Sequence, residues 1–227
     1  MTERRGAKAW RDLTLLAERV VWRGSDRTLF VADLHLGKTA SFRAGGSPAP
    51  TGVSDATLSR LGAVIDETGA KRLVALGDFL HSRTSMTDRL FASLCSWRAA
   101  RPSLECIIVR GNHDLHSGDP DERCGFECVD EPHDCGGLEG RHHPLSEGDA
   151  LKEGPVVLAG HLHPAAILYG PGRDRLKLPC FAVCGRQIIL PAFGEFTGGA
   201  SLAVGPDRWL AATTGADLFI LRQSPSR

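Results

Sequence analysis

The chain has 227 residues, of which 42% are hydrophobic and 24% charged, as in an ordinary folded domain. Its 27 Lys and Arg residues balance its 27 Asp and Glu residues, so net charge gives no argument for a polyanionic or membrane partner. We expect no secretory signal, because charged residues interrupt the first apolar run, and no apolar run approaches the roughly 20 residues of a membrane span. With seven scattered cysteines, we expect reduced thiols in a cytoplasmic protein without a membrane partner, folded as a single domain over 1–227 with its core from about 20 to 221.

The first half of the chain predicts strands that alternate with helices. Apolar runs at 20–22 and 28–32, separated by a turn, predict a hairpin, and the Gly- and Pro-rich residues 37–53 predict a long loop. The elements expected next are helices over about 55–68 and 86–99, the second capped by Ser85, and strands over 72–76 and 105–109. This order is typical of parallel crossover units.

The second half of the chain changes character. Residues 116–150 have weak periodicity and predict a variable loop. After an apolar run at 157–159, strands follow without intervening helices, at 177–183, 187–190, 202–204, 209–212 and 218–221. This predicts a second, largely antiparallel sheet. The expected fold is therefore α/β, a four-layer α-β-β-α sandwich of two mixed β-sheets flanked by helices.

Four short apolar runs each end, within a residue or two, in side chains of the kinds that bind metals. These side chains are Asp33 and His35, Asp78, Asn112 with His113 and Asp114, and His161 with His163. The carboxyl edge of a sheet is where open α/β folds gather ligands, so groups from separate strands can converge there. Each motif alone is weak, because Asp, Asn and His are common in turns. Their recurrence after four strands predicts a metal site.

The chemistry of this set narrows its use. Asp, His and Asn together suit Mn, Fe or Zn. Two such metals about 3.5–4 Å apart can hold the attacking and leaving oxygens of a phosphoryl displacement and lower the pKa of bound water from 15.7 to about 7. His113 is spare from the ligand count, and with Asp114 beside it we expect a catalytic role, stabilising the transition state or protonating the leaving alkoxide.

A second metal site, made of cysteines, is the competing interpretation of an acidic segment. Cys124, Cys128, Cys135 and His133 have the residue types of a zinc clip. Their spacing lacks the usual C-x2-C pair, and acidic side chains surround them. The sequence therefore favours ordinary reduced thiols here.

The motifs resemble the signature of the calcineurin-like metallophosphoesterases. The matching segments are Asp33-x-His35, Gly77-Asp78, Gly111-Asn112-His113-Asp114 and Gly160-His161-Leu162-His163. The resemblance implies the double-sheet fold, one metal on Asp33, His35 and His163, another on Asn112 and His161, Asp78 as the bridge and His113 as the catalytic histidine. It also implies one further histidine ligand on the second metal. His142, in an H-x-P arrangement with Pro144, is assigned to it, with His143 as the alternative.

A narrower resemblance covers most of residues 20–204. The segments 38–52 (KTASFRAGGSPAPTG), 160–164 (GHLHP), 178–181 (LPCF) and 191–199 (PAFGEFTGG) are similar to those of the DNA ligase-associated metallophosphoesterases. This resemblance implies a manganese-dependent phosphodiesterase or endonuclease, with Fe, Zn or Mg as alternative metals. It implies DNA as the substrate, single-stranded or flapped, and a DNA ligase, an exonuclease and a helicase as partners in repair.

The sequence also suggests two residues that bind the substrate, and it leaves three functions open. Lys38 and Arg43 follow His35 closely, where they could receive a phosphate oxygen. The first function is a DNA phosphodiesterase, the second a phosphoesterase for a nucleotide diester or pyrophosphate, and the third a non-catalytic scaffold. Neutral net charge mildly favours the second, because DNA binding relies on Lys and Arg. The complete set of ligand types argues against the third.

Overall fold

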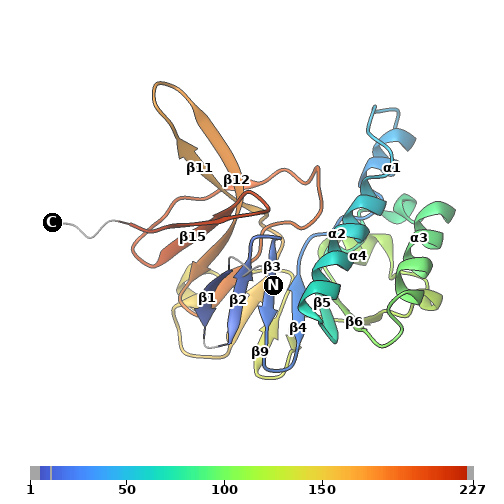
Figure 1. The fold of residues 1–227 in the computed structure, drawn as a ribbon, viewed down its shortest axis with the longest axis horizontal. Helices are drawn as coiled ribbons and strands as arrows, with labels where there is room; N and C mark the ends of the chain where they lie inside the picture. The colour runs from blue at the N-terminus through green and yellow to red at the C-terminus, as the bar shows by residue number, and fades with distance from the viewer. Residues whose placement is uncertain (1–5, 11, 224–227) are drawn as a thin grey trace.

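Two β-sheets pack face to face, and helices lie beside the first of them (Figure 1). The computed structural model describes residues 6–10 and 12–223. The first sheet holds its strands in chain order: β1 (Gly6–Trp10), β2 (Leu13–Leu16), β3 (Val20–Arg23), β4 (Thr28–Val31), β5 (Arg72–Leu76), β6 (Glu105–Val109) and β7 (Glu127–Val129). Short turns make β1 to β4 antiparallel, whereas longer crossovers make β4 to β7 parallel.

The crossover segments carry the helices. These are α1 (Lys38–Ala44), α2 (Val53–Thr68), the 3-10 helix η1 (Arg83–Ser85), α3 (Asp88–Ala99), α4 (Asn112–Ser117), the 3-10 helix η2 (Glu122–Cys124) and α5 (Glu147–Ala150). Leu58, Leu61 and Ile65 recur at helical spacing on α2 and pack with Leu94 of α3 onto one face of the first sheet. Gly69 ends α2 in the left-handed conformation.

The second sheet is mixed. Its strands are β8 (His133–Asp134), β9 (Leu138–Gly140), β10 (Val156–Ala159), β11 (Pro164–Tyr169), β12 (Arg175–Cys184), β13 (Gln187–Ile189), β14 (Ala200–Ser201), β15 (Arg208–Thr213) and β16 (Leu218–Leu221). The spatial order is β14-β11-β12-β13-β10-β9-β8, with β15 on β12 and β16 on β15. The strands β9, β10 and β13 run parallel, while β11, β12 and β13 form an antiparallel meander.

The core between the sheets fixes their relative position. Phe30 of β4 points into it, while its neighbours Leu29 and Val31 point to the helices, as the period-two pleat of a strand requires. From the second sheet, Leu158 and Phe181 enter the same core and are fully buried. Because β4 is buried on both faces, its residues from Leu29 to Val31 are continuously apolar rather than alternating.

The α/β class with two mixed sheets is the expected one, but its helices are unevenly distributed. They lie beside the first sheet in Figure 1, and the longest helix described after β9 is the four-residue α5. The other face of the second sheet carries a small hydrophobic cluster of its own, with Ala166, Ile189 and Leu210 at its centre. In the part of the chain that the structure describes, this cluster consists of strand residues and Leu202, and no helix contributes to it. The expectation of a single domain over 1–227 stays a prediction.

Several element boundaries differ from the sequence-based expectation. The predicted loop 37–53 contains helix α1, and the predicted loop 116–150 contains β7 and β9. Thr87, not Ser85, caps α3, because its hydroxyl accepts a hydrogen bond from the Leu90 amide at 3.2 Å. The expected strand at 202–204 is replaced by β14 two residues earlier, and β11 was missed. These elements are short or follow turn residues directly, so they have little periodicity.

Two cysteines of the suggested zinc clip are buried on opposite faces of the first sheet. Cys124 lies in the core under the helices and Cys135 in the core between the sheets. Burial raises the pKa of the Cys124 thiol to about 12 and that of Cys135 to about 11. Among the described residues, no cysteine belongs to a group of clustered metal-ligand atoms. The geometry therefore agrees with reduced thiols rather than a zinc clip.

None of the helices described in this chain combines the length and apolar character needed to cross a lipid bilayer.

Candidate metal centre

The side chains singled out in the sequence meet where the carboxyl ends of two sets of parallel strands come together. Asp33 and His35 follow β4, Asp78 follows β5, Asn112 follows β6, His142 follows β9, and His161 and His163 follow β10. Parallel neighbours end at the same edge of a sheet, so β4, β5 and β6 share one edge and β9 and β10 share another. The packing of the sheets brings the two edges together.

A first group of ligand atoms comes from Asp33, His35, Asp78 and His163, which all lie within 4.8 Å of one another. The Nε2 atoms of His35 and His163 are 3.3 Å apart. His163 Nε2 lies 3.5 Å from Asp33 Oδ1, and His35 Nε2 lies 3.6 Å from Asp78 Oδ2. Both carboxylates are buried. These are the residues expected on the first metal, together with the expected bridge.

A second group gathers on the other side of Asp78. His142 Nε2 lies 2.9 Å from Asn112 Oδ1, 3.1 Å from His161 Nδ1 and 3.4 Å from Asp78 Oδ1. One oxygen of Asp78 thus faces the first group while the other faces the second. The two groups therefore share a single buried carboxylate.

The choice between the two adjacent histidines follows from their partners. His142 is fully buried, and its Nδ1 donates to the Leu76 carbonyl at 3.1 Å, which leaves Nε2 directed into the second group. His143 is partly exposed, and its Nδ1 pairs with Glu131 Oε1 at 2.6 Å. Glu131 also accepts the backbone amides of both histidines and so holds this segment in place. The geometry favours His142, although His143 also borders the group.

The ligand atoms of the second group are acceptors that face one another, so a cation would satisfy them better than they satisfy each other. Because the Leu76 carbonyl can only accept, the neutral ring of His142 presents a lone pair at Nε2. That lone pair faces Asn112 Oδ1 and Asp78 Oδ1, which are also acceptors. Within the part of the chain that the structure describes, the ion-pair partners of Asp33 and Asp78 are all histidines. A divalent cation would satisfy these converging acceptors and their charge.

Burial sets the protonation states in the same direction. It lowers the pKa of His35 to about 2, and it also lowers the pKa values of His142 and His161, so these rings stay neutral. Burial lowers the pKa of His163 as well, but the hydrogen bond and charge of Asp33 outweigh this and raise it. Neutral imidazole is the form that binds metals.

The backbone at this centre is strained. Asp33, His35, Asp78, His161 and His163 have φ angles of 55°, 46°, 50°, 70° and 46°, a left-handed conformation that is uncommon outside glycine. Such residues cost roughly 1–3 kcal/mol each and persist where the surroundings determine them, often at functional sites. Here the Asp33 amide donates to the Gly77 carbonyl and the His35 amide to the Asp78 carbonyl. Neighbouring strand ends therefore hold one another in this conformation.

His113 and Asp114 have different surroundings. His113 Nδ1 donates to the His81 carbonyl at 2.7 Å, and its Nε2 lies 4.0 Å from Asp78 Oδ2, so the ring faces the centre. Asp114 is buried and accepts backbone amides from Gly111 and Leu80 at 2.9 and 3.1 Å. The expectation that both residues are catalytic stays a prediction. The contacts of Asp114 tie two strand-end loops together, which suits a residue that positions the centre.

Lys38 and Arg43, the two residues expected to bind the substrate, have different surroundings. Lys38 lies near enough to Asp78 for that carboxylate to raise its pKa, although burial outweighs the effect and the pKa is lowered overall. Arg43 donates to the carbonyls of Ala49 and Pro50 at 3.2 and 2.6 Å, so it closes the loop after α1. The structure therefore brings Lys38 toward the centre, whereas Arg43 contacts its own loop, and phosphate binding by either residue stays a prediction.

His81 is a residue of the centre that the sequence analysis missed. Its Nδ1 lies 3.5 Å from His35 Nδ1, and its ring stacks on His113 with 5.0 Å between centroids. Burial lowers its pKa to about 4, aided by Lys38 and His113. The available signal was its place three residues after Asp78 in the same loop.

Comparison with known proteins identifies the family. Residues 26–178 match the family model described as calcineurin-like phosphoesterase. The chain belongs to this family. The family implies a dinuclear metal centre, and the two groups around Asp78 offer the ligands for one, so this calcineurin-like phosphoesterase is a metal-dependent hydrolase of phosphate esters. The resemblance inferred from the motifs is confirmed.

Two solved structures are similar to the chain. The nuclease MPE from Pseudomonas putida has 34% sequence identity and a TM-score of 0.81, with 96% of this chain and 100% of that chain covered. Yfce, a phosphoesterase from E. coli, has 16% identity and a TM-score of 0.39 over 87% of this chain and 97% of its own, too low to add to the argument. A search of curated proteins gave no significant match.

Gly77 offers a test of the packing around His142. Its φ is +80°, and a Cβ there would overlap the buried imidazole of His142. Gly46 has a φ of +81° with open space around it, so Gly46→Ala is a matched control for the backbone cost alone. We expect Gly77→Ala to weaken metal binding by at least about 10-fold, as displaced ligand supports do, measured by calorimetric titration with Mn²⁺. Equal metal affinity in the two variants would contradict the close packing of His142 on this loop.

Proposed function

We propose that this calcineurin-like phosphoesterase is a phosphodiesterase that cuts DNA as an endonuclease, with single-stranded or flapped segments as its substrate. The observation that carries the hydrolytic part is the single buried carboxylate of Asp78 between two groups of imidazole ligands. The DNA substrate is supported by the similarity to the nuclease MPE along nearly the whole chain. It is also supported by the motifs shared with the ligase-associated enzymes.

We assign the ligand residues to two cations. Asp33, His35 and His163 would hold one, and Asn112, His142 and His161 would hold the other, with Asp78 contributing to both. Manganese is our proposal, with Fe, Zn or Mg as alternatives, because the donor set mixes carboxylate, amide and imidazole. Such a pair supplies an activated water and neutralises charge that develops on the phosphate.

The remaining groups of the centre act on the substrate. The Nδ1–H of His113 is held by the His81 carbonyl, so the proton at Nε2 of its charged form points into the centre and can pass to the leaving oxygen. Lys38, which is close enough to Asp78 to feel its charge, would hold a phosphate oxygen. Asp114 fixes the loops that carry Asp78 and His113.

One observation favours a smaller substrate as a second candidate. The chain has no excess of basic residues, with 27 Lys and Arg against 27 Asp and Glu, although DNA binding relies on such residues. A nucleotide diester or pyrophosphate would need fewer of them. The cations themselves add local positive charge, which reduces the force of this argument. The retained ligand set argues against a non-catalytic scaffold.

The cellular setting is part of the same proposal. The motifs at 38–52 and 191–199, which resemble those of the ligase-associated enzymes, support a role in DNA repair. We propose a cytoplasmic enzyme that works with a DNA ligase, an exonuclease and a helicase.

The substrate proposal is tested with purified protein and Mn²⁺ on circular single-stranded DNA, linear duplex and nucleotide diesters. We expect the circle to be linearised, which only an endonuclease can do. Duplex of the same length should be cut far more slowly, and rates on the circle should fall with salt because phosphate contacts release counterions. Hydrolysis of nucleotide diesters or pyrophosphate, with the circle left intact, would contradict the proposal in favour of the second candidate.

His113→Gln tests the proton donor. We expect kcat on DNA to fall by roughly 10²–10⁴-fold, the usual contribution of general acid–base catalysis, while both metals stay bound. The loss on bis-p-nitrophenyl phosphate should be smaller, because nitrophenolate leaves without a proton. His116→Gln is the matched control, since His116 lies on the same helix and is exposed. Loss of metal, or equal losses on both substrates, would contradict the assigned role.

A further inference from the structure

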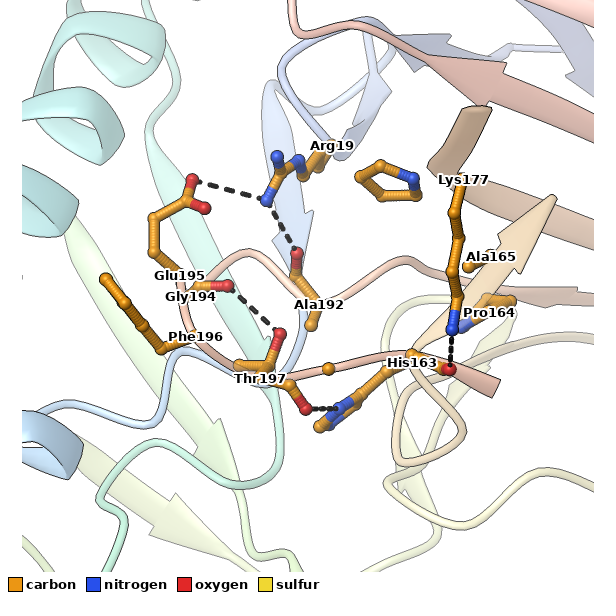
Figure 2. Close-up of a pocket in the computed structure, with 13 residues that line it drawn as sticks. Arg19, His163, Pro164, Ala165, Lys177, Ala192, Gly194, Glu195, Phe196 and Thr197 are labelled. Atoms are coloured by element: carbon orange, nitrogen blue, oxygen red, sulfur yellow. Dashed lines mark hydrogen bonds and ion pairs between the residues drawn. The ribbon is translucent and has the colours of Figure 1, made fainter. Parts of the chain in front are cut away.

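A pocket of about 310 Å³ opens beside His163, between residues 192–199 and the strands β11 and β12 (Figure 2). We call it the His163 pocket, and its lining includes Arg19, His163, Lys177, Ala192, Phe196 and Thr197. Its size is at the lower end of the roughly 300–1,000 Å³ that small-ligand sites occupy. One nucleotide fits this scale, whereas a duplex does not.

The pocket is continuous with the metal centre through His163 itself. His163 Nδ1 donates to the Thr197 carbonyl at 3.2 Å, and its own carbonyl accepts the Ala200 amide at 3.0 Å. A Cβ on Gly199 would come within 3.0 Å of that carbonyl, so the loop lies tightly against it. The Nε2 atom of His163 meanwhile faces Asp33 and His35. A molecule in the pocket therefore lies directly beside the first ligand group.

The charges around the pocket favour an anion. Glu195, the one acidic residue among the described residues of the lining, is already paired with Arg19 at 3.3 Å and with Arg60. Lys177 stands on the other side, exposed, where one of its three donors reaches the Gly199 carbonyl at 2.6 Å. Within the lining, the guanidinium of Arg19 and the ammonium of Lys177 against the one carboxylate of Glu195 leave a net positive charge. A phosphate group complements it.

The rim of the pocket carries an exposed aromatic ring. Phe196 is 57% exposed, and its φ of 60° places it in the left-handed region. Figure 2 shows it on the side of the pocket opposite Lys177. A strained backbone that presents a large apolar side chain to solvent is costly for folding alone, and such strain accumulates at ligand sites. An exposed ring across a pocket from an ammonium group offers an unpaired nucleotide a surface for its base and a partner for its phosphate.

We propose that the His163 pocket binds an unpaired nucleotide next to the scissile phosphate, with its base stacked on Phe196 and an adjacent phosphate held by Lys177. The inference rests on the proposed DNA substrate and adds the site that selects single strands. A base in duplex has both faces covered by its neighbours, so it cannot stack on Phe196 without leaving the helix. The pocket therefore makes an unpaired strand the better substrate.

The test compares kcat/KM on a single-stranded oligonucleotide with kcat/KM on bis-p-nitrophenyl phosphate, which has no base and one phosphate. Stacking is worth about 1–3 kcal/mol per base, so Phe196→Ala should lower the DNA-to-aryl-ester ratio by roughly 5- to 150-fold. Phe196→Trp should restore it. Lys177→Gln should reduce the slope of log affinity against log salt by about 0.7, the value for one phosphate on a single strand.

Matched controls separate the pocket from the rest of the surface. Phe219→Ala removes a ring that is 44% exposed on β16, and Lys152→Gln removes an exposed ammonium beside α5, so neither should change the ratio or the slope. If wild-type protein cuts single strands but Phe196→Ala leaves the ratio unchanged, or Phe196→Trp fails to restore it, the pocket inference is overturned alone. If wild-type protein hydrolyses the aryl ester but no DNA, the proposed substrate fails and the inference fails with it.

Discussion

The buried carboxylate of Asp78 is the constraint on which the arrangement depends. It is 2% exposed and faces His35 with one oxygen and His142 with the other. His35 follows a strand of the first sheet and His142 follows a strand of the second, so this contact exists only when the sheets pack in one register. The core that contains Phe30 and Phe181 supplies that register. The packing of the core between the sheets therefore also determines the geometry of the metal centre.

Bringing these ligands together requires unfavourable backbone conformations and repulsive contacts. Left-handed residues, facing acceptors and buried carboxylates would each destabilise an isolated loop. They persist because amides of one strand end bind carbonyls of the next and because an apolar core packs between the two sheets behind them. Cations would relieve much of the electrostatic part. The His163 pocket depends on the same contacts, since the loop that positions His163 also exposes Phe196.

The sequence predicted what depends on local pattern and missed what depends on tertiary context. The strands β5, β6 and β16 have the bounds expected from the sequence, and the polar residues after β4, β5, β6 and β10 were recognised from type and order. Helix α1 was missed because it is seven residues long and sits in a Gly- and Pro-rich stretch. The left-handed backbone at Asp33 and the loop contact of Arg43 depend on which carbonyls lie nearby, and no residue pattern encodes that.

The most direct test of the account is the metal content of the purified protein, measured by inductively coupled plasma mass spectrometry after Mn²⁺ loading and desalting. The geometry predicts two equivalents per chain, and a large loss of both in Asp78→Asn, because that carboxylate serves both ligand groups. Asp66→Asn, which alters an exposed carboxylate paired with Arg101, should retain both. Two equivalents in Asp78→Asn, or none in active wild-type protein, would contradict the claim that Asp78 joins two cation sites.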